Sequence, residues 1–286
     1  MPSLPTPWAV LGVGIAGRAR ARAIADDPRA RLVGVVVGRF AESVADELEV
    51  PVLPDLDAAI ERAEAVAVCT PSPLHPEHVE QVLGAGRHAV VEFPLAPSRA
   101  VGAELFARAR AGNLLLHVEH IELLTGAAVA LRGHGPFHRA HVGFTSSGDG
   151  DVESLVTSAV ARLHRLIDAA GPLASAPVRS AHASDGRLDA EVLLASGLVA
   201  TFTVERRAGL PRNTVLELDG AHRWRLDGRD VTRDGAPVSL PDPGPLFLAD
   251  QRAASARLHD GAAPYVDEAT VLAVLGAVDA LRDAVR

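Results

Sequence analysis

The chain contains no lysine and a single cysteine, Cys69. Without lysine, no side chain can form a Schiff base, and no ammonium group can act as a catalytic acid or base. One cysteine excludes a disulfide within the chain and a cysteine-ligated zinc site, and it fits a cytoplasmic location. We therefore expect Cys69 to be a small buried residue rather than a nucleophile, and we expect no metal site.

Aromatic residues, long apolar runs and positive charge are also scarce. Aromatics make up 3% of the 286 residues, so we expect a core of Val, Leu and Ala. No run of about 18 apolar residues occurs, so no transmembrane helix is expected. The net charge of −8 gives no general attraction to nucleic acid or to anionic membranes. These features indicate a globular protein of about two ordinary domains.

The first part of the chain alternates short apolar strands with helices. This alternation predicts a parallel, doubly wound sheet, and we assign residues 1–118 to a dinucleotide-binding Rossmann domain. The expected strands are 8–13, 31–37, 65–69, 88–91 and 114–117.

The pattern changes after residue 118. Helices are expected at 119–131 and 153–170, followed by strand-like segments with Gly or Asp turns up to residue 226. Two helices, near 246–258 and 264–285, close the chain. The fold class is therefore an α/β Rossmann domain followed by an α+β domain, residues 119–286, with a large, mostly antiparallel sheet. Any homo-oligomer is expected to form through this sheet.

A G-x-G-x-x-G motif lies between the first strand and the first helix. Gly12 allows the tight turn, Gly14 lets the backbone approach a pyrophosphate, and Gly17 lets helix and strand pack closely. The helix N-terminus, with Ile15 and Ala16, supplies free N–H groups for the phosphates. The alternative, a tight turn without a ligand, is less consistent with this position in a βαβ unit.

The second strand ends at Gly38 and Arg39, where NAD-selective folds usually carry Asp or Glu. A guanidinium group can bind the 2′-phosphate that a carboxylate would repel. The sequence therefore favours NADP(H), with NAD(H) as the second choice. The alternative is that Arg39 is an exposed loop arginine.

A third candidate cofactor segment follows the strand at 65–69. Thr70, Pro71 and Ser72 lie at the expected carboxyl edge of the sheet, where the nicotinamide ribose would run. His75 is a further candidate, although it could simply begin the next helix.

Five motifs, at 70–75, 92–95, 117–124, 161–163 and 247–251, belong to one pattern that runs from about Trp8 to Leu258. This pattern resembles the biliverdin reductase branch of the glucose-fructose oxidoreductase/inositol dehydrogenase (Gfo/Idh/MocA) family. The family usually carries Glu-Lys-Pro with a catalytic lysine, whereas biliverdin reductases carry Glu-Tyr-Pro. Here Phe93 stands at that position. Other members also carry a histidine where this chain, counted back from Gly171, has Arg162, whereas biliverdin reductases carry an arginine in that helix.

This resemblance implies NADPH-dependent reduction of biliverdin at its central methine, giving bilirubin, or of a similar conjugated substrate. Glu92 and Pro94 would lie beside the nicotinamide, and Arg162 would act electrostatically with Glu92, Phe93 and Glu119 as the other catalytic residues. The flat bilin would lie between the nicotinamide and the sheet of the second domain. The alternative role for Arg162 is a salt bridge on an amphipathic helix.

The resemblance also implies a polar cluster where the two domains join, formed by Glu92, Glu119, His120 and Glu122. Glu119 and Glu122 could equally solvate or cap a helix. A bilin has two carboxylates, and the arginines that could bind them are Arg179, Arg206, Arg207 and Arg212.

Two other functions remain open. One is a Gfo/Idh/MocA-like oxidoreductase that acts on an unrelated secondary metabolite. The other is a non-catalytic protein that binds NADP(H) without turnover, which the missing lysine and histidine would favour over sugar dehydrogenation.

Overall fold

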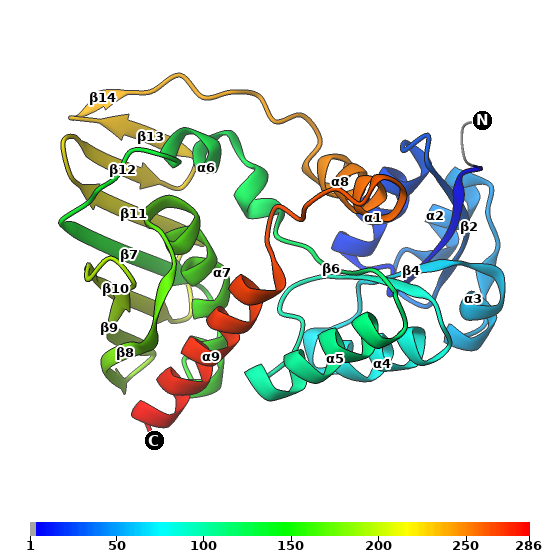
Figure 1. The fold of residues 1–286 in the computed structure, drawn as a ribbon, viewed down its shortest axis with the longest axis horizontal. Helices are drawn as coiled ribbons and strands as arrows, with labels where there is room; N and C mark the ends of the chain where they lie inside the picture. Colours follow the sequence, from blue (N-terminus) through cyan, green and yellow to red (C-terminus); the bar gives the residue numbers. More distant parts are fainter. Residues whose placement is uncertain (1–3) are drawn as a thin grey trace. The chain divides into compact units, whose positions relative to one another are not determined.

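Residues 4–286 are described by a computed structural model, in which the chain forms two units (Figure 1). Unit 1 comprises the chain up to Ile121 together with residues 244–268, and unit 2 comprises residues 122–243 and 269–286. The division expected from the sequence, 1–118 and 119–286, treated each domain as one continuous segment. It did not anticipate that residues 244–268 return to unit 1.

Unit 1 contains a six-stranded parallel sheet in the order β3-β2-β1-β4-β5-β6, which is the Rossmann order. The strands are β1 (Thr6–Leu11), β2 (Ala30–Val36), β3 (Val52–Leu53), β4 (Ala65–Val68), β5 (His88–Val91) and β6 (Leu116–Val118). The helices are α1 (Ile15–Ala25), α2 (Ala41–Leu48), α3 (Leu56–Arg62), η1 (Ser72–Leu74), α4 (His75–Gly84), α5 (Arg99–Ala111) and α8 (Leu246–Asp260).

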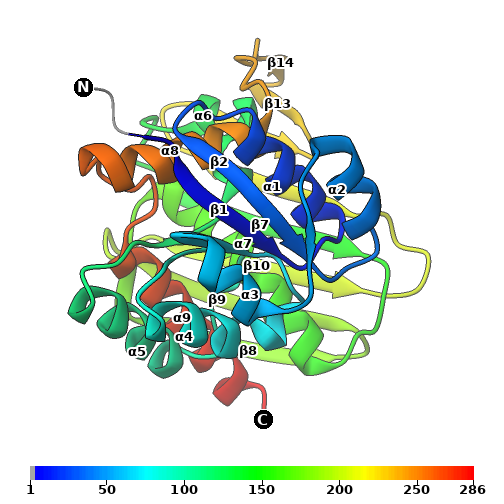
Figure 2. The same ribbon diagram turned by 90° about the vertical axis from the view of Figure 1, so that its right-hand side faces the viewer.

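Helices cover both faces of this sheet. α1, α2 and α8 lie on one face, and α3, α4 and α5 lie on the other (Figure 2). Right-handed crossovers produce these two layers, because the chain moves outward from β1 to β3 and then returns past β1 to β4. Every residue of β4 is buried, as expected for a central strand with both faces covered.

Unit 2 contains an eight-stranded sheet in the order β14-β13-β12-β11-β7-β10-β9-β8. All neighbouring strands are antiparallel except β7 and β10, which confirms the expected fold class. The strands are β7 (Arg139–Ser146), β8 (Leu173–Ser184), β9 (Arg187–Leu194), β10 (Val199–Arg206), β11 (Asn213–Asp219), β12 (Arg223–Asp227), β13 (Asp230–Arg233) and β14 (Ala236–Pro237).

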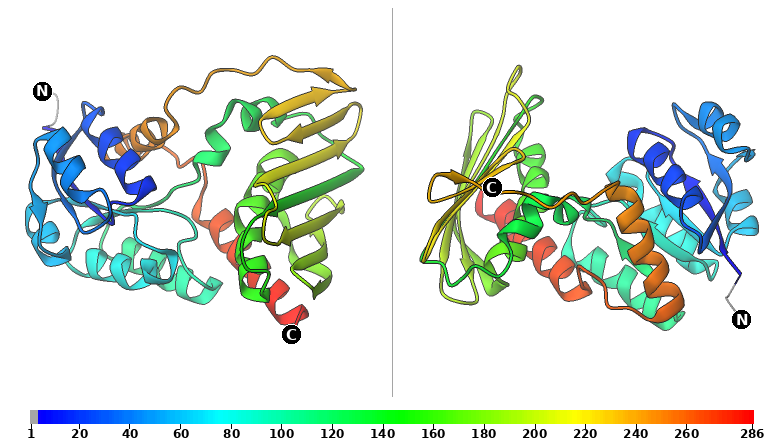
Figure 3. Two further views of the ribbon diagram at one scale, coloured as in Figure 1. Left: turned by 180° about the vertical axis from the view of Figure 1, so that it is seen from behind. Right: turned by 90° about the horizontal axis from the view of Figure 1, so that it is seen from above.

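The helices of unit 2 lie on one face of the sheet (Figure 3). They are η2 (Ile121–Leu124), α6 (Gly126–Leu131), α7 (Val152–Ala170) and α9 (Glu268–Ala284), of which η2 and α9 each begin with one residue of unit 1. α7 packs against β7, β9, β10 and β11. Buried and less buried residues alternate along β7 and β9, because successive side chains of a strand point to opposite faces.

The helix expected at 119–131 is wrong as a single element. The structure has η2 and α6 instead, separated by Thr125, whose hydroxyl accepts a hydrogen bond from the Ala128 N–H as the N-cap of α6. Gly126 lies so close to Pro241 that a Cβ would fall 2.1 Å from the Pro241 carbonyl oxygen.

Within residues 4–286, no helix combines the length and hydrophobicity that crossing a membrane requires.

Candidate active site

The loop that joins β1 to α1 has the geometry of a dinucleotide-binding turn. Gly12 has a φ of +90°, and a Cβ there would lie 2.7 Å from the Thr70 backbone nitrogen. A Cβ on Gly17 would lie 2.1 Å from the Gly12 carbonyl oxygen, whereas a Cβ on Gly14 would meet nothing within 4 Å. Open space therefore lies at the N-terminus of α1, and these glycines fit a pyrophosphate there.

Exposed apolar side chains beside this loop support the same assignment. Ile15, Val37 and Leu74 are 80%, 61% and 42% exposed and lie beyond the carboxyl ends of β1, β2 and β4. Ala16 is half-buried in the first turn of α1. Carboxyl ends of parallel strands share one edge, which is where doubly wound sheets bind ligands. A dinucleotide at this edge would cover apolar surface that water otherwise contacts.

The end of β2 is followed by Gly38 and Arg39, and Arg18 of α1 lies close to them. Gly38 is required there, because its φ is +138° and a Cβ would lie 2.5 Å from the Val13 backbone nitrogen. Arg39 is exposed, and its guanidinium lies over the Phe40 ring, 5.6 Å from the centroid. Arg18 lies over the same ring at 5.1 Å. This arrangement suits an anionic group at the end of β2.

The loop after β4 is held in place by His75, which is buried. Its Nδ1 lies 2.8 Å from the Pro94 carbonyl oxygen, and its Nε2 lies 2.7 Å from the Thr70 carbonyl oxygen. The imidazole thus ties the loops after β4 and β5 together, so its evident role is to position them. Pro71 is exposed and Ser72 half-buried at the same edge. Contact of these residues with a cofactor stays a prediction.

Glu92, Phe93 and Pro94 directly follow β5. The Glu92 backbone N–H donates to the Val68 carbonyl, and the Glu92 side chain is 15% exposed. The Phe93 ring stacks on the His120 ring with centroids 5.9 Å apart and an interplanar angle of 15°. Phe93 has no ionisable group, so it can shape a site but cannot transfer a proton.

Glu119 follows β6 and forms a carboxyl pair with Glu92. The Glu119 carboxyl hydrogen bonds to Glu92 and also accepts the Ile121 N–H. Burial, together with the charges of Glu92 and Asp250, raises the pKa of Glu119 well above its usual range. The pair therefore presents a neutral carboxylic acid beside Glu92, an arrangement that can hold and move a proton.

Cys69 lies beside the same pair, with its Sγ 3.7 Å from Glu92 Oε1. Burial of the sulfur and the negative charge of Glu92 raise the pKa of the Cys69 thiol well above its usual range. The group is thus a thiol and not a nucleophilic thiolate, in agreement with the expectation from the sequence.

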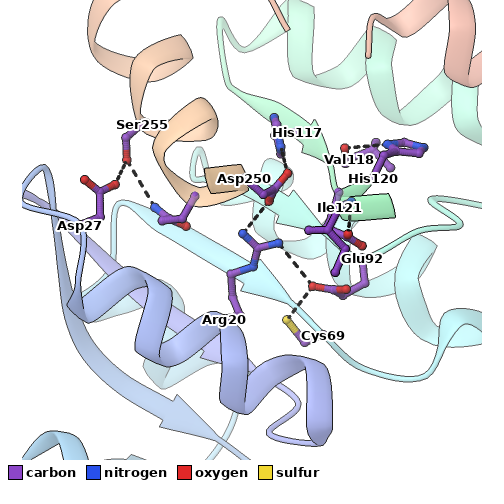
Figure 4. Close-up of polar contacts among 12 residues, drawn as sticks. Arg20, Asp27, Cys69, Glu92, His117, Val118, His120, Ile121, Asp250 and Ser255 are labelled. Atoms are coloured by element: carbon purple, nitrogen blue, oxygen red, sulfur yellow. Dashed lines mark hydrogen bonds and ion pairs between the residues drawn. The ribbon is translucent and has the colours of Figure 1, made fainter. Parts of the chain in front are cut away.

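A buried ionic network that sequence reasoning missed lies behind Glu92 (Figure 4). Arg20, on α1, has a fully buried side chain. Its Nη1 lies 2.6 Å from Asp250 Oδ2 on α8, and its Nη2 lies 3.5 Å from Glu92 Oε1. Burial alone would lower the pKa of Arg20, but Asp250 and Glu92 raise it, so the guanidinium is firmly charged. Arg20 therefore links the cofactor-loop helix to Glu92.

Two further side chains hold Asp250. His117 Nε2 lies 2.8 Å from Asp250 Oδ1, and the Tyr265 hydroxyl donates to the same oxygen while accepting the His120 N–H. Arg257 donates to His117 Nδ1 at 3.2 Å, so the proton of the imidazole lies on Nε2 and is donated to Asp250. Although burial would raise it, Arg20 and His117 hold the pKa of Asp250 far below its usual range.

In unit 2, Arg162 lies on the buried face of α7 and its side chain is 5% exposed. Its Nη2 donates to the Thr214 hydroxyl at 3.2 Å, and its guanidinium lies over the Phe144 ring, 3.7 Å from the centroid. Burial and the nearby charges of Arg212 and Arg165 lower the pKa of Arg162 to about 10, with Glu122 opposing them. The alternative role, a salt bridge on an amphipathic helix, is also present, because Arg162 Nη2 lies 3.8 Å from Glu122 Oε1, although this pair is buried and not at the surface.

The arginines considered for substrate carboxylates have different positions. Arg179 is exposed on β8, and Arg207 is exposed and lies 3.4 Å from Glu205. Arg206 donates to the Ser158 hydroxyl on α7 at 3.1 Å. Arg212 is close to Glu122, Arg162 and Phe144. Among residues 4–286, no group of three His, Cys, Asp or Glu side chains is arranged to hold a metal ion.

Residues 7–120 match the Gfo/Idh/MocA family, described as an oxidoreductase family with an NAD-binding Rossmann fold. The match covers the N-terminal domain, which is less than half of the chain. A nicotinamide dinucleotide is therefore the cofactor of this domain, as the glycine loop predicted.

Two curated relatives extend the comparison. The chain is 35% identical to mouse (Mus musculus) biliverdin reductase A over 118 residues, which are 40% of this chain and 39% of that protein. It is 33% identical to UDP-N-acetylglucosamine 3-dehydrogenase of Acidithiobacillus ferrooxidans over 129 residues, which are 44% and 40% of the two chains. The matched segments thus span about two fifths of the length of these relatives.

A solved structure matches the whole chain. The biliverdin reductase of Synechocystis, crystallised with biliverdin and NADP⁺, superposes with a TM-score of 0.86. The superposition covers 98% of this chain and 99% of that chain, at 24% sequence identity. This similarity shows that the two proteins share a fold across both units.

Proposed function

We propose that the chain is an NADPH-dependent reductase of biliverdin or of a similarly flat, conjugated substrate. The observation that carries the proposal is Arg162, a buried guanidinium on α7 at the position where the resemblance to biliverdin reductases requires an arginine. The relation of the N-terminal domain to biliverdin reductase A supports the same assignment.

Unit 1 would bind the cofactor. Gly12, Gly14 and Gly17 would hold the pyrophosphate at the N-terminus of α1, and Arg39 would bind the 2′-phosphate, so we propose a preference for NADP(H) over NAD(H). When bound, the nicotinamide supplies a hydride to the substrate. Phe93 and Pro94 would shape the site beside it, and Thr70, Pro71 and Ser72 would line the ribose.

Reduction of a conjugated substrate also needs a proton and a stabilised negative charge. Arg162 would stabilise negative charge on the substrate, since a guanidinium stays protonated and is a poor acid by itself. The Glu92–Glu119 pair holds a proton on Glu119, and we propose that this pair supplies or replaces the proton through bound water. If the chain forms a homo-oligomer, we expect the uncovered face of the unit 2 sheet to mediate it.

A second candidate function follows from the similarity to UDP-N-acetylglucosamine 3-dehydrogenase. A Gfo/Idh/MocA-like oxidoreductase acting on an unrelated metabolite would use the same cofactor loop. Phe93 in place of the lysine of the Glu-Lys-Pro motif, in a chain without any lysine, argues against alcohol oxidation by the usual residues. The third candidate function is binding of NADP(H) without turnover. The assay below distinguishes it from the two enzyme functions.

The test is reduction of biliverdin by NADPH, followed in the visible spectrum for the parent protein and for Arg162→Ala. We expect the parent to convert biliverdin to bilirubin and the variant to lose about a hundredfold or more in kcat with unchanged NADPH affinity. Arg282→Ala, which removes a partly buried arginine that pairs with Glu153 at the start of α7, is the control and should keep the parent rate. Equal rates for the parent and Arg162→Ala would refute this role of Arg162, and no reduction by the parent would refute the bilin assignment.

A further inference from the structure

Arg20 makes unequal contacts with two carboxylates in unit 1 (Figure 4). Its Nη1 lies 2.6 Å from Asp250 Oδ2, whereas its Nη2 lies 3.5 Å from Glu92 Oε1. The side chains of Arg20 and Asp250 are fully buried. Because Coulomb attraction falls with distance, most of the Arg20 charge is used by Asp250, and Glu92 keeps part of its negative charge without compensation.

The orientation of Arg20 is fixed from the side of α8. Asp250 receives hydrogen bonds from His117 Nε2 and from the Tyr265 hydroxyl, so its carboxylate cannot turn freely. Asp250 in turn fixes one end of the guanidinium, and the other end stays directed at Glu92. A continuous set of buried polar contacts therefore runs from α8 through Arg20 to Glu92.

The carboxyl pair formed by Glu92 and Glu119 is asymmetric. Arg20 contacts Glu92 Oε1, and the Cys69 thiol donates to the same oxygen at 3.7 Å. Glu119 is 1% exposed and accepts the Ile121 N–H. Arg20 also interacts more strongly with Glu92 than with Glu119. These contacts favour a negative charge on Glu92 and a proton on Glu119.

We propose that Arg20 is a positioning residue for proton transfer, which holds the negative charge of the pair on Glu92 and leaves Glu119 as the acid. When Glu119 gives up its proton, the pair becomes two carboxylates, and a proton from solvent later restores the acid. Arg20 stabilises these two negative charges, so Glu119 can release its proton more readily. The inference rests on the proposed function for the use of the proton, whereas the position of the proton can be measured without a substrate.

The effect of Arg20 must be separated from that of its titratable neighbours, which are Cys69, His117, His120, Asp250 and Tyr265. Burial raises the pKa of the Cys69 thiol and of the Tyr265 phenol far above their usual ranges, so both groups are neutral. Asp250 adds a second negative charge, and the imidazole of His120 donates from Nδ1 to the Val118 carbonyl. Arg20 is the cation in direct contact with Glu92, so its substitution should change the charge at Glu92 most directly.

The position of the proton can be tested by NMR titration of protein with isotope-labelled glutamate carboxyl carbons, in which Glu92→Gln and Glu119→Gln assign the two signals. We expect Glu92 to be ionised and Glu119 to be protonated at pH 7 in the parent. In Arg20→Gln, Glu92 should take up a proton at a pH higher by about one unit or more, because a nearby opposite charge favours the ionised form. Arg20→Lys keeps the charge and should reverse most of this shift.

Two further variants separate this effect from a loss of folding. Arg20→Gln leaves Asp250 buried without its main partner, so the double variant Arg20→Gln/Asp250→Asn, which removes both charges of the ion pair, is titrated as well. Glu92 should still take up its proton at a higher pH than in the parent. Arg22→Gln is the control, because Arg22 is an exposed arginine of α1 that pairs with Glu47 at 2.6 Å, and it should leave the titration unchanged. The same Glu92 titration in the parent, Arg20→Gln and the double variant would overturn the inference.

The pH dependence of kcat tests the use of the proton. In the parent, kcat should fall at high pH as Glu119 loses its proton. Without Arg20, Glu119 holds its proton more tightly, so the alkaline limb should move to higher pH by about one unit, and kcat below it should fall about tenfold with unchanged KM. An unchanged profile would overturn the role of Arg20 in proton transfer. If the parent does not reduce biliverdin, the reductase proposal fails, while the NMR titration still decides where the proton lies.

Discussion

Two buried arginines, one in each unit, have opposite electrostatic environments. Arg20 lies 2.6 Å from Asp250 and 3.5 Å from Glu92, and these carboxylates raise its pKa against the effect of burial. Arg162 lies 3.8 Å from Glu122, a carboxylate that also pairs with Arg165 and Arg212, and burial lowers the pKa of Arg162 to about 10. Arg20 therefore behaves as a structural charge with its partners in place, whereas Arg162 has the under-compensated charge that suits binding and catalysis.

At the residue scale, Arg39 is expected to select the cofactor. Arg39→Asp places a carboxylate at the end of β2, where it would repel a 2′-phosphate and accept ribose hydroxyl groups. We expect NADPH to bind the parent more tightly than NADH, and the variant to lose about tenfold or more of this preference. The measurement is titration of cofactor fluorescence.

Arg31→Asp is the matched control, because Arg31 is also exposed on β2 but lies toward its amino end. This variant should keep the parent preference, since the charge change is the same and only its position differs. Parent protein that binds NADH as tightly as NADPH would show that Arg39 is an ordinary loop arginine.

At the element scale, α8 is fastened to unit 1 by buried polar groups. Asp250 pairs with Arg20 of α1, and Ser255 donates to Asp27 at the end of α1. These contacts place residues more than two hundred positions apart beside each other. The return of α8 thus completes one helical layer of the Rossmann domain and supplies the counter-ion of Arg20.

This attachment predicts that substitution of two aspartates of α8 has very different effects on the stability of the protein. Asp250→Asn leaves the Arg20 charge buried without its main partner and should lower the free energy of unfolding by about 3–5 kcal/mol. Asp260→Asn removes the exposed ion pair with Arg29, which solvent screens, and should lower the free energy of unfolding far less. Denaturation in urea at pH 7 makes the comparison, and equal losses for the two variants would contradict the proposed attachment.

The pH dependence of this difference has a definite sign. The pKa of Asp250 is lowered in the folded protein, so its contribution is complete above the unfolded value of about 3.9 and is lost as the pH falls toward the folded value. The gap between parent and Asp250→Asn should therefore be constant near neutral pH and shrink in acid.

The sequence was sufficient to predict those parts of the fold that depend on neighbouring residues in the chain. The glycine motif at Gly12–Gly17 predicted the turn, and the apolar strands predicted the parallel sheet. The pairing of Arg20 with Asp250 could not be predicted in the same way, because it depends on α8 crossing back to α1. The sequence did contain one indication that Arg20 is buried. Helical periodicity places Arg20 on the same face of α1 as Gly17, and that face is buried.

Tertiary context also decided the segment after β6. Apolar periodicity favoured one helix from 119 to 131, but Thr125 caps a new helix and Gly126 lies against the Pro241 carbonyl. Glu119 consequently lies in the turn after β6, where its carboxyl meets Glu92, and not on a helical face with Glu122.

At the scale of the whole molecule, the two units contribute different chemistry. Under the proposed function, unit 1 would bind the cofactor through the glycine loop and Arg39, and the Glu92–Glu119 pair would move the proton. Unit 2 would supply Arg162, whose buried guanidinium would stabilise negative charge on the substrate. A reductase needs both sets, whereas a protein that only stores NADP(H) would not need a buried, under-compensated guanidinium.

The most direct test of the reductase function is the transfer of hydrogen from cofactor to substrate. Biliverdin is incubated with the protein and NADPH that carries deuterium at both C4 positions, and the product is examined by mass spectrometry and NMR. We predict bilirubin with one deuterium at the central methylene bridge, formed at a rate that falls about a hundredfold in Arg162→Ala. Recovery of unreduced biliverdin, or of product without deuterium, would contradict hydride transfer from the nicotinamide to this substrate.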